Sequence, residues 1–186
     1  MNVLVLSGDN HGFAASAQVI HDFLAQQPDM QVTLSADKAV LTSPQLQTFD
    51  ALVFGTGFTR SSRQADGTVK RESDLTAEQE EGLRTFVASG KGLVGAHGTA
   101  WWISGRAMDL IGGAANWHPP GLTFTVHVEA GDHPITQGVD DFEVEDEIYI
   151  SAYEPTLRIL ASAEWQGRAF PMAWTKSFGQ GRVFYT

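Results

Sequence analysis

The first half of the chain alternates apolar runs with segments of helical periodicity. Residues 2–7 form a continuous apolar run, the pattern of a strand buried on both faces. Similar runs predict three more strands, at residues 31–34, 51–54 and 92–96. Strands that alternate with helices indicate a parallel sheet.

Two helices are predicted between these strands. Apolar residues at helical spacing mark one face of the first helix: Phe13, Ala17, Ile20 and Leu24. The second helix begins at Thr76, which forms a capping-box pattern with Gln79, and ends near Gly90. We therefore expect helices on both faces of the parallel sheet.

The second half has the pattern of antiparallel strands. Residues 122–128 alternate, with Phe124, Val126 and Val128 on one side and His127 on the outward side. Further strands are predicted at residues 143–150, 157–160, 172–174 and 182–185. We therefore expect an α/β fold, a three-layer α/β/α sandwich with a parallel core sheet and an antiparallel extension, in a single domain spanning residues 1–186. The strand at residues 182–185 has no sequence after it, so we expect an uncovered edge and apolar face that favour a homo-oligomer.

A long loop interrupts the first half. Residues 56–74 carry four cations, Arg60, Arg63, Lys70 and Arg71, and Asp66-Gly67 is typical of the turn of a small hairpin. The loop is either a functional insertion or a solvated one.

Composition excludes several classes of function. The 186 residues carry 12 Lys and Arg against 22 Asp and Glu, a net charge of −10, so a nucleic-acid partner is not expected. The chain has no cysteine, which excludes disulfides, thiolate metal sites and cysteine nucleophiles. The start has no basic region, and the long uncharged stretch at residues 92–105 contains four glycines and a histidine. We expect a cytoplasmic protein with no membrane partner.

His97 is the strongest candidate for chemistry. Ligands of parallel sheets bind at the carboxyl ends of the strands, and His97 follows the strand predicted at residues 92–96. In Gly95-Ala96-His97-Gly98-Thr99, small residues flank it as they flank the functional side chain at a tight strand-to-helix turn. His97 would act as a base, an acid or a metal ligand, or else it is a structural histidine bonded to backbone.

Two more histidines, His11 and His118, occupy positions that favour a functional role. His11 lies in the loop after the first strand, and His118 precedes Pro119, which restricts its backbone. Together with His97 and a carboxylate they would suit zinc or another divalent metal, although no compact metal motif is present. Each is equally consistent with an ordinary loop histidine. The glycines between Gly90 and Gly95 match a dinucleotide pattern but end a helix and open a strand, so no nucleotide cofactor is expected.

An acidic segment and several aromatic residues complete the candidates. If residues 143–150 form one strand, Asp146 and Glu147 face opposite sides and only one reaches the cleft; the alternative is a solvated acidic edge. Aromatic rings suit the apolar faces of sugars. We expect His97 and Glu147 to be catalytic, and Trp101, Trp117 and Arg60 to bind substrate.

Ordered blocks along nearly the whole chain resemble the ThuA-like (trehalose utilisation) family of the class I glutamine amidotransferase-like superfamily. These blocks include residues 86–97, His118-Pro119-Pro120-Gly121, Asp146-Glu147-Ile148-Tyr149 and residues 179–186. The resemblance implies a flavodoxin-like fold, with His97 where true amidotransferases carry cysteine. It also implies a role in carbohydrate metabolism, with trehalose, other glycosides or their keto derivatives as candidate substrates.

Two classes of function remain open. The first is an enzyme that acts on a carbohydrate, such as a hydrolase or an isomerase, around His97. The second is a non-catalytic sugar-binding or interaction module on an amidotransferase-like scaffold. Glutaminase activity is not expected in either case, because the acyl-enzyme step needs a thiolate and the chain has no cysteine.

Overall fold

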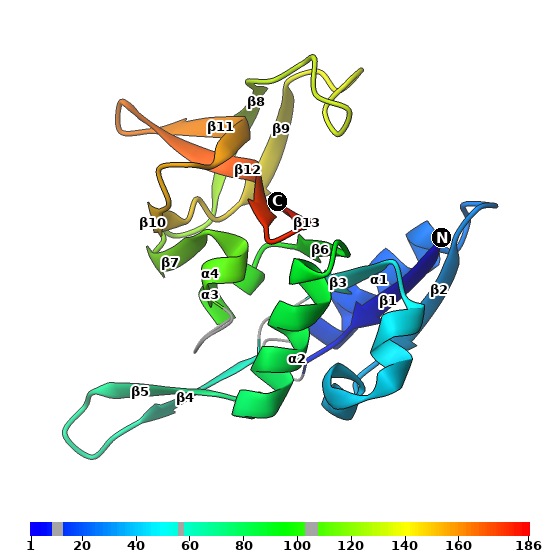
Figure 1. Cartoon of the computed structure of the whole chain (residues 1–186). Helices are drawn as coiled ribbons and strands as arrows, with labels where there is room; N and C mark the ends of the chain where they lie inside the picture. Colours follow the sequence, from blue (N-terminus) through cyan, green and yellow to red (C-terminus); the bar gives the residue numbers. More distant parts are fainter. Residues whose placement is uncertain (9–12, 56–57, 103–107) are drawn as a thin grey trace.

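The computed structural model describes residues 1–8, 13–55, 58–102 and 108–186. Across these residues, the largest sheet has nine strands in the order β2-β1-β3-β6-β13-β12-β11-β8-β9. Its first five strands are parallel, and its last four run antiparallel to their neighbours. The predicted α/β class, with a parallel core and an antiparallel extension, is confirmed (Figure 1).

The parallel half contains all four strands predicted in the first half of the sequence. Its strands are β1 (Asn2–Leu6), β2 (Gln31–Ser35), β3 (Ala51–Phe54), β6 (Gly92–Gly95) and β13 (Gly181–Tyr185). Alternate residues of these strands enter two separate apolar clusters, one on each face. Helix α1 (Phe13–Leu24) supplies Ala17 to one cluster, and α2 (Ala77–Ala88) supplies Phe86 to the other. The predicted cover of helices on both faces is therefore present.

Helix α2 begins at the predicted capping box. The Thr76 hydroxyl accepts the Gln79 backbone N–H, and the Gln79 side chain accepts the Thr76 backbone N–H. The β2–β3 connection is not an α-helix but two short 3-10 turns, η2 (Lys38–Thr42) and η3 (Pro44–Thr48). A Cβ at Gly82 would lie 1.9 Å from the Leu41 carbonyl oxygen, so this glycine lets α2 pack closely against η2.

The antiparallel half consists of β8 (Leu122–Val128), β9 (Phe142–Asp146), β11 (Arg158–Trp165) and β12 (Arg168–Phe178). Along β8 the side chains alternate between partly buried or buried and exposed, as predicted, and His127 faces solvent. The prediction that the strand at residues 182–185 has an uncovered edge is wrong. Strand β13 pairs with β6 on one side and β12 on the other, because the antiparallel half continues the sheet beyond it.

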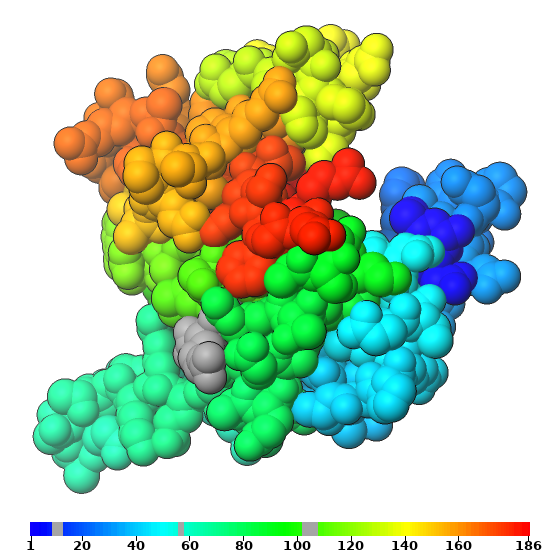
Figure 2. Space-filling model, viewed as in Figure 1, coloured from blue at the N-terminus to red at the C-terminus, as the bar shows by residue number. Residues whose placement is uncertain are grey.

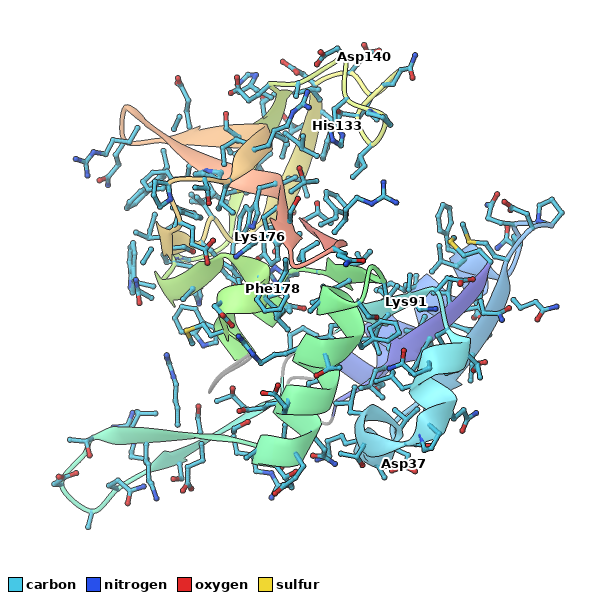
Figure 3. The ribbon with its side chains drawn as sticks, in the orientation of Figure 1. Asp37, Lys91, His133, Asp140, Lys176 and Phe178 are labelled. Carbon is cyan, nitrogen blue, oxygen red and sulfur yellow. The ribbon has the colours of Figure 1, made fainter. Side chains whose placement is uncertain are left out.

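The predicted strand at residues 143–150 divides in two. Strand β9 ends at Asp146, and β10 (Ile150–Tyr153) leaves the large sheet to pair with β7 (Gly113–Trp117), which the sequence did not predict. Short helices α3 (Thr99–Trp102) and α4 (Met108–Ile111) precede β7. Lys176 on β12 lies beside α4 and donates to the Asp109 carbonyl and the Glu154 carboxylate, both at 2.6 Å (Figure 3).

The long loop of the first half is a hairpin. Strands β4 (Thr59–Arg63) and β5 (Val69–Ser73) pair antiparallel, and Gly67 adopts a φ of 84° at the predicted turn. The hairpin extends from the body of the molecule as an arm, at the lower left of Figure 2. Within the described residues, no helix has the length and apolar character needed to cross a membrane.

Candidate functional site

His97 lies at a tight turn between a strand and a helix. Strand β6 ends at Gly95 and α3 begins at Thr99, so His97 occupies the carboxyl end of a central parallel strand, as predicted. Its φ is 39°, a left-handed backbone conformation that side chains other than glycine rarely adopt. A Cβ at the following residue, Gly98, would lie 2.3 Å from the Phe13 ring, so a side chain there would require this ring to move.

Backbone hydrogen bonds hold His97 in this conformation. Its N–H donates to the Thr186 carbonyl at 2.6 Å, and the Tyr185 hydroxyl donates to its carbonyl at 2.7 Å. Burial raises the pKa of Tyr185, so its hydroxyl remains a donor. A left-handed residue other than glycine costs about 1–3 kcal/mol, and such strain persists where surrounding contacts fix it. The backbone thus presents the imidazole at a defined position.

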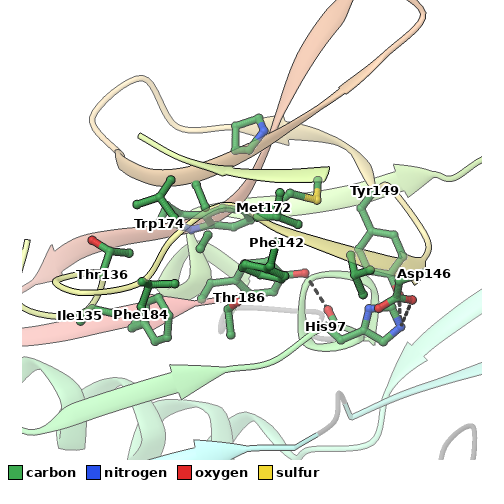
Figure 4. Close-up of a pocket in the computed structure, with 18 of the residues that line it drawn as sticks. His97, Ile135, Thr136, Phe142, Asp146, Tyr149, Met172, Trp174, Phe184 and Thr186 are labelled. Atoms are coloured by element: carbon green, nitrogen blue, oxygen red, sulfur yellow. Dashed lines mark hydrogen bonds and ion pairs between the residues drawn. The ribbon is translucent and has the colours of Figure 1, made fainter. Parts of the chain in front are cut away.

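The His97 imidazole stacks on the ring of Tyr149. The ring centroids are 5.0 Å apart and the planes differ by 17°. Its Nε2 lies 3.4 Å from the Tyr149 hydroxyl and 3.9 Å from Oδ1 of Asp146 (Figure 4). His97 therefore has a phenol and a carboxylate close to the same ring nitrogen.

Tyr149 remains a neutral phenol. Burial, followed by the nearby carboxylates of Glu147 and Asp146, raises the pKa of Tyr149 well above its ordinary value. Its hydroxyl lies 3.4 Å from Nε2 of His97, and the tautomer of His97 sets which of the two groups donates the hydrogen bond.

His118 forms a second histidine–carboxylate pair. Its Nδ1 lies 2.9 Å from the Pro119 carbonyl oxygen and 3.5 Å from Oε1 of Glu147. Both oxygens are acceptors, so Nδ1 carries a proton. In the neutral ring, Nε2 of His118 then has a free lone pair and can accept a proton.

These groups border a polar cavity of about 430 Å³. Its lining consists of Phe13, Ser61, Arg71, His97, Trp101, His118, Glu147 and Tyr149. The Trp101 ring meets the edge of His118 at 5.5 Å between centroids and lies 5.9 Å from the Tyr149 ring. The volume lies in the range of small-molecule sites, and the wall combines aromatic rings with a few polar groups.

A second cavity, of about 350 Å³, adjoins the first. His97, Glu147 and Tyr149 line both cavities. Elsewhere the second cavity is mainly apolar, with Phe142, Met172 and Phe184 among its lining residues (Figure 4). The His97–Tyr149 stack is therefore the wall between a polar and an apolar hollow.

Asp146 and Glu147 do not lie on one strand, so the condition under which they would face opposite sides is not met. Strand β9 ends at Asp146, so the alternation of a strand does not extend to Glu147. Asp146 approaches His97, and Glu147 approaches His118. The turn in the chain brings both carboxylates to the site.

The structure brings together four of the candidate residues: His97, His118, Glu147 and Trp101 all line the polar cavity. Arg60 instead forms an ion pair with Asp74 at 2.6 Å. Trp117 is 51% exposed and packs against Trp165. Neither Arg60 nor Trp117 lines either cavity.

The candidate metal site falls partly outside the described residues, because His11 does. Within the described part of the chain, no three side chains of His, Asp or Glu are grouped as metal ligands. His97 and His118 both line the polar cavity, but the described residues do not group them with a third metal ligand.

Sequence reasoning did not select several lining residues as site residues: Phe13, Ser61, Arg71 and Tyr149. A signal was present for two of them. Tyr149 ends the block Asp146-Glu147-Ile148-Tyr149, and Arg71 is one of the four cations of the hairpin. Selecting Arg71 over Arg60 required the register of β4 and β5.

Comparisons with known proteins agree on the fold. The ThuA family model, described as trehalose utilisation, matches residues 2–186. A ThuA-like protein from Bacteroides uniformis superposes with a TM-score of 0.73 at 16% identity, covering 100% of this chain and 80% of that one. A cytoplasmic protein from Salmonella typhimurium LT2 gives 0.67 at 14% identity, covering 100% and 86%.

A domain of a larger enzyme has the same fold. The β-galactosidase from Bacillus circulans sp. alkalophilus matches with a TM-score of 0.65 at 12% identity, over 98% of this chain and 28% of that one. No curated protein matches the sequence.

Proposed function

Since the chain belongs to the ThuA family, related to trehalose utilisation, we propose that it binds a glycoside or keto-sugar in the polar cavity and transforms it by proton transfer at His97. One observation carries this proposal: His97, His118 and Glu147 converge on one aromatic-walled cavity. Histidine exchanges protons near neutral pH, and an imidazole paired with a carboxylate is a common acid–base catalyst.

In this proposal, the residues that line the cavity have two roles, sugar binding and proton transfer. The rings of Trp101 and Tyr149 offer apolar surface to the C–H groups of a sugar, while Ser61 and Glu147 offer hydrogen bonds to its hydroxyls. Nε2 of His118 is a proton acceptor in the neutral ring. His97, with Asp146 at 3.9 Å, can gain a proton and be stabilised as an imidazolium. In this proposal one histidine accepts a proton and the other donates one, and the rings of both lie close to the Tyr149 ring, at 5.0 Å and 5.8 Å between centroids.

Replacing His97 by alanine tests the proposal. We expect the His97→Ala variant to lose turnover by about 100- to 10,000-fold, the usual contribution of a general acid or base. Trehalose, methyl glycosides and their keto derivatives are the substrates, with products followed by NMR and affinities by calorimetry. Folding should survive, because the backbone bonds of residue 97 do not use its side chain.

His21→Ala is the matched control. His21 lies on α1, pairs with the neighbouring Asp22 and lines neither cavity, so its removal should leave turnover and affinity unchanged. Sugar binding without turnover in the wild type would instead identify a sugar-binding module. Full activity in His97→Ala, or no binding of any sugar by the wild type, would overturn the assignment.

A further inference from the structure

The β4–β5 hairpin supplies one wall of the polar cavity. Ser61 and Arg71 are direct partners in the antiparallel register, and both line the cavity. Partners in a sheet share a face, and the neighbouring pair Arg60–Glu72 lies on the opposite face. The register of the two hairpin strands therefore determines which of the hairpin's cations lines the cavity.

Arg71 is held against Trp101. Its Cζ lies 4.8 Å from the centroid of the Trp101 ring. A guanidinium stacked on an aromatic face has its plane fixed and keeps the N–H donors at its edge free for a planar or tetrahedral anion. Arg71 is thus oriented as a recognition group.

Three of the neighbouring cations are paired with carboxylates. Arg60 and Lys38 both pair with Asp74, and Lys70 pairs with Glu72 at 2.7 Å. Within the described residues, neither Arg71 nor Arg63 has such a carboxylate, and of these two only Arg71 lines a cavity. The carboxylate of the cavity, Glu147, lies 3.5 Å from Nδ1 of His118.

We propose that the sugar bound here carries an anionic group, a carboxylate or a phosphate, and that Arg71 is the residue that selects it. This inference rests on the proposed carbohydrate site. A chain with a net charge of −10 repels anions at long range, so an acidic ligand needs a local cation. Arg71 supplies that cation in the lining of the same cavity as His97 and His118, where it would orient the ligand toward His97.

Affinities for three ligands test this inference: methyl glucoside, methyl glucuronide and glucose 6-phosphate, each measured by calorimetry at two salt concentrations. We expect the wild type to bind at least one acidic sugar about 10- to 100-fold more tightly than the neutral one, the contribution of a hydrogen-bonded charge. The glucuronide and the phosphate distinguish the two sources of charge. The preference should weaken at high salt.

The Arg71→Gln variant should lose the preference, so that its affinities for acidic and neutral sugars agree within about twofold, because the charge-assisted bonds are removed. Arg63→Gln is the matched control, since Arg63 pairs with Val69 on the same face of the hairpin but lines no cavity. It should keep the preference.

Equal affinities for neutral and acidic sugars in the wild type would overturn this inference and leave the proposed function standing. A preference that survives in Arg71→Gln would also overturn it. If no sugar of any charge binds, both the inference and the proposed function fail.

Discussion

The two halves of the nine-stranded sheet are buried in different ways. In the parallel half, consecutive residues Val3, Leu4, Val5 and Leu6 are each at most 2% exposed, because helices cover both faces. In the antiparallel half, β8 alternates and β9 is mainly exposed, with Phe142 48% exposed. Burial on both faces requires an apolar residue at every position, whereas burial on one face requires it at every second position.

The candidate site draws on both halves. The parallel half contributes His97 at the carboxyl end of β6, and the antiparallel half contributes Asp146 at the end of β9. Tyr149 lies in the segment that joins β9 to β10 and stacks on His97. The chemistry is therefore located where the rigid, doubly covered half meets the half with one open face.

The largest expected effect compares one leucine from each half. Leu52→Ala on β3 should lower the free energy of unfolding by about 2–5 kcal/mol, because the side chain is fully buried and its removal leaves a cavity. Leu122→Ala on β8 should cost clearly less, because that side chain is already partly exposed. Urea unfolding of both variants measures the difference, and equal losses would break the comparison.

A smaller effect is expected at the helix that covers the parallel half. Thr76→Ala removes the hydroxyl that caps α2 and should cost about 1 kcal/mol. Thr125→Ala, at an exposed position of β8, should change stability by less than about 0.5 kcal/mol. Thermal or urea unfolding compares the two threonines, and a neutral Thr76→Ala would show that packing alone holds the helix end.

The smallest effect is a pH dependence in the antiparallel half. A hydrogen bond to Asp141 raises the pKa of His127, and hydrogen bonds from the Val128 N–H and His127 lower the pKa of Asp141. The stabilisation by His127 is present at low pH and lost as pH rises through its raised pKa. The stabilisation by Asp141 is present at high pH and is lost as the pH falls through the lowered pKa of this carboxyl group. The pair should thus stabilise most between these two pKa values.

NMR titration of His127 checks this pair. In Asp141→Asn the pKa of His127 should fall toward that of an ordinary histidine, because the hydrogen bond to the carboxylate is removed. An unchanged His127 pKa would show that Asp141 does not contribute the charge.

The sequence predicted the parallel half best. Its strands are marked by continuous apolar runs, and the turn at His97 by small residues, both local signals. The boundary at residues 143–150 was missed because β10 leaves the sheet to pair with β7, a partner more than 30 residues earlier in the chain. Pairing over such distances is set by tertiary packing rather than local propensity.

The sequence by itself determined the α/β class, the position of His97 at the carboxyl end of β6, and the absence of a cysteine nucleophile. These follow from the periodicity and identity of neighbouring residues. Only the tertiary structure decided that both Asp146 and Glu147 reach the site, and that Arg71 rather than Arg60 faces the cavity. The physical reason is that a side chain's direction depends on where its strand ends and on the register of its partner, and neither is encoded within a short stretch of sequence.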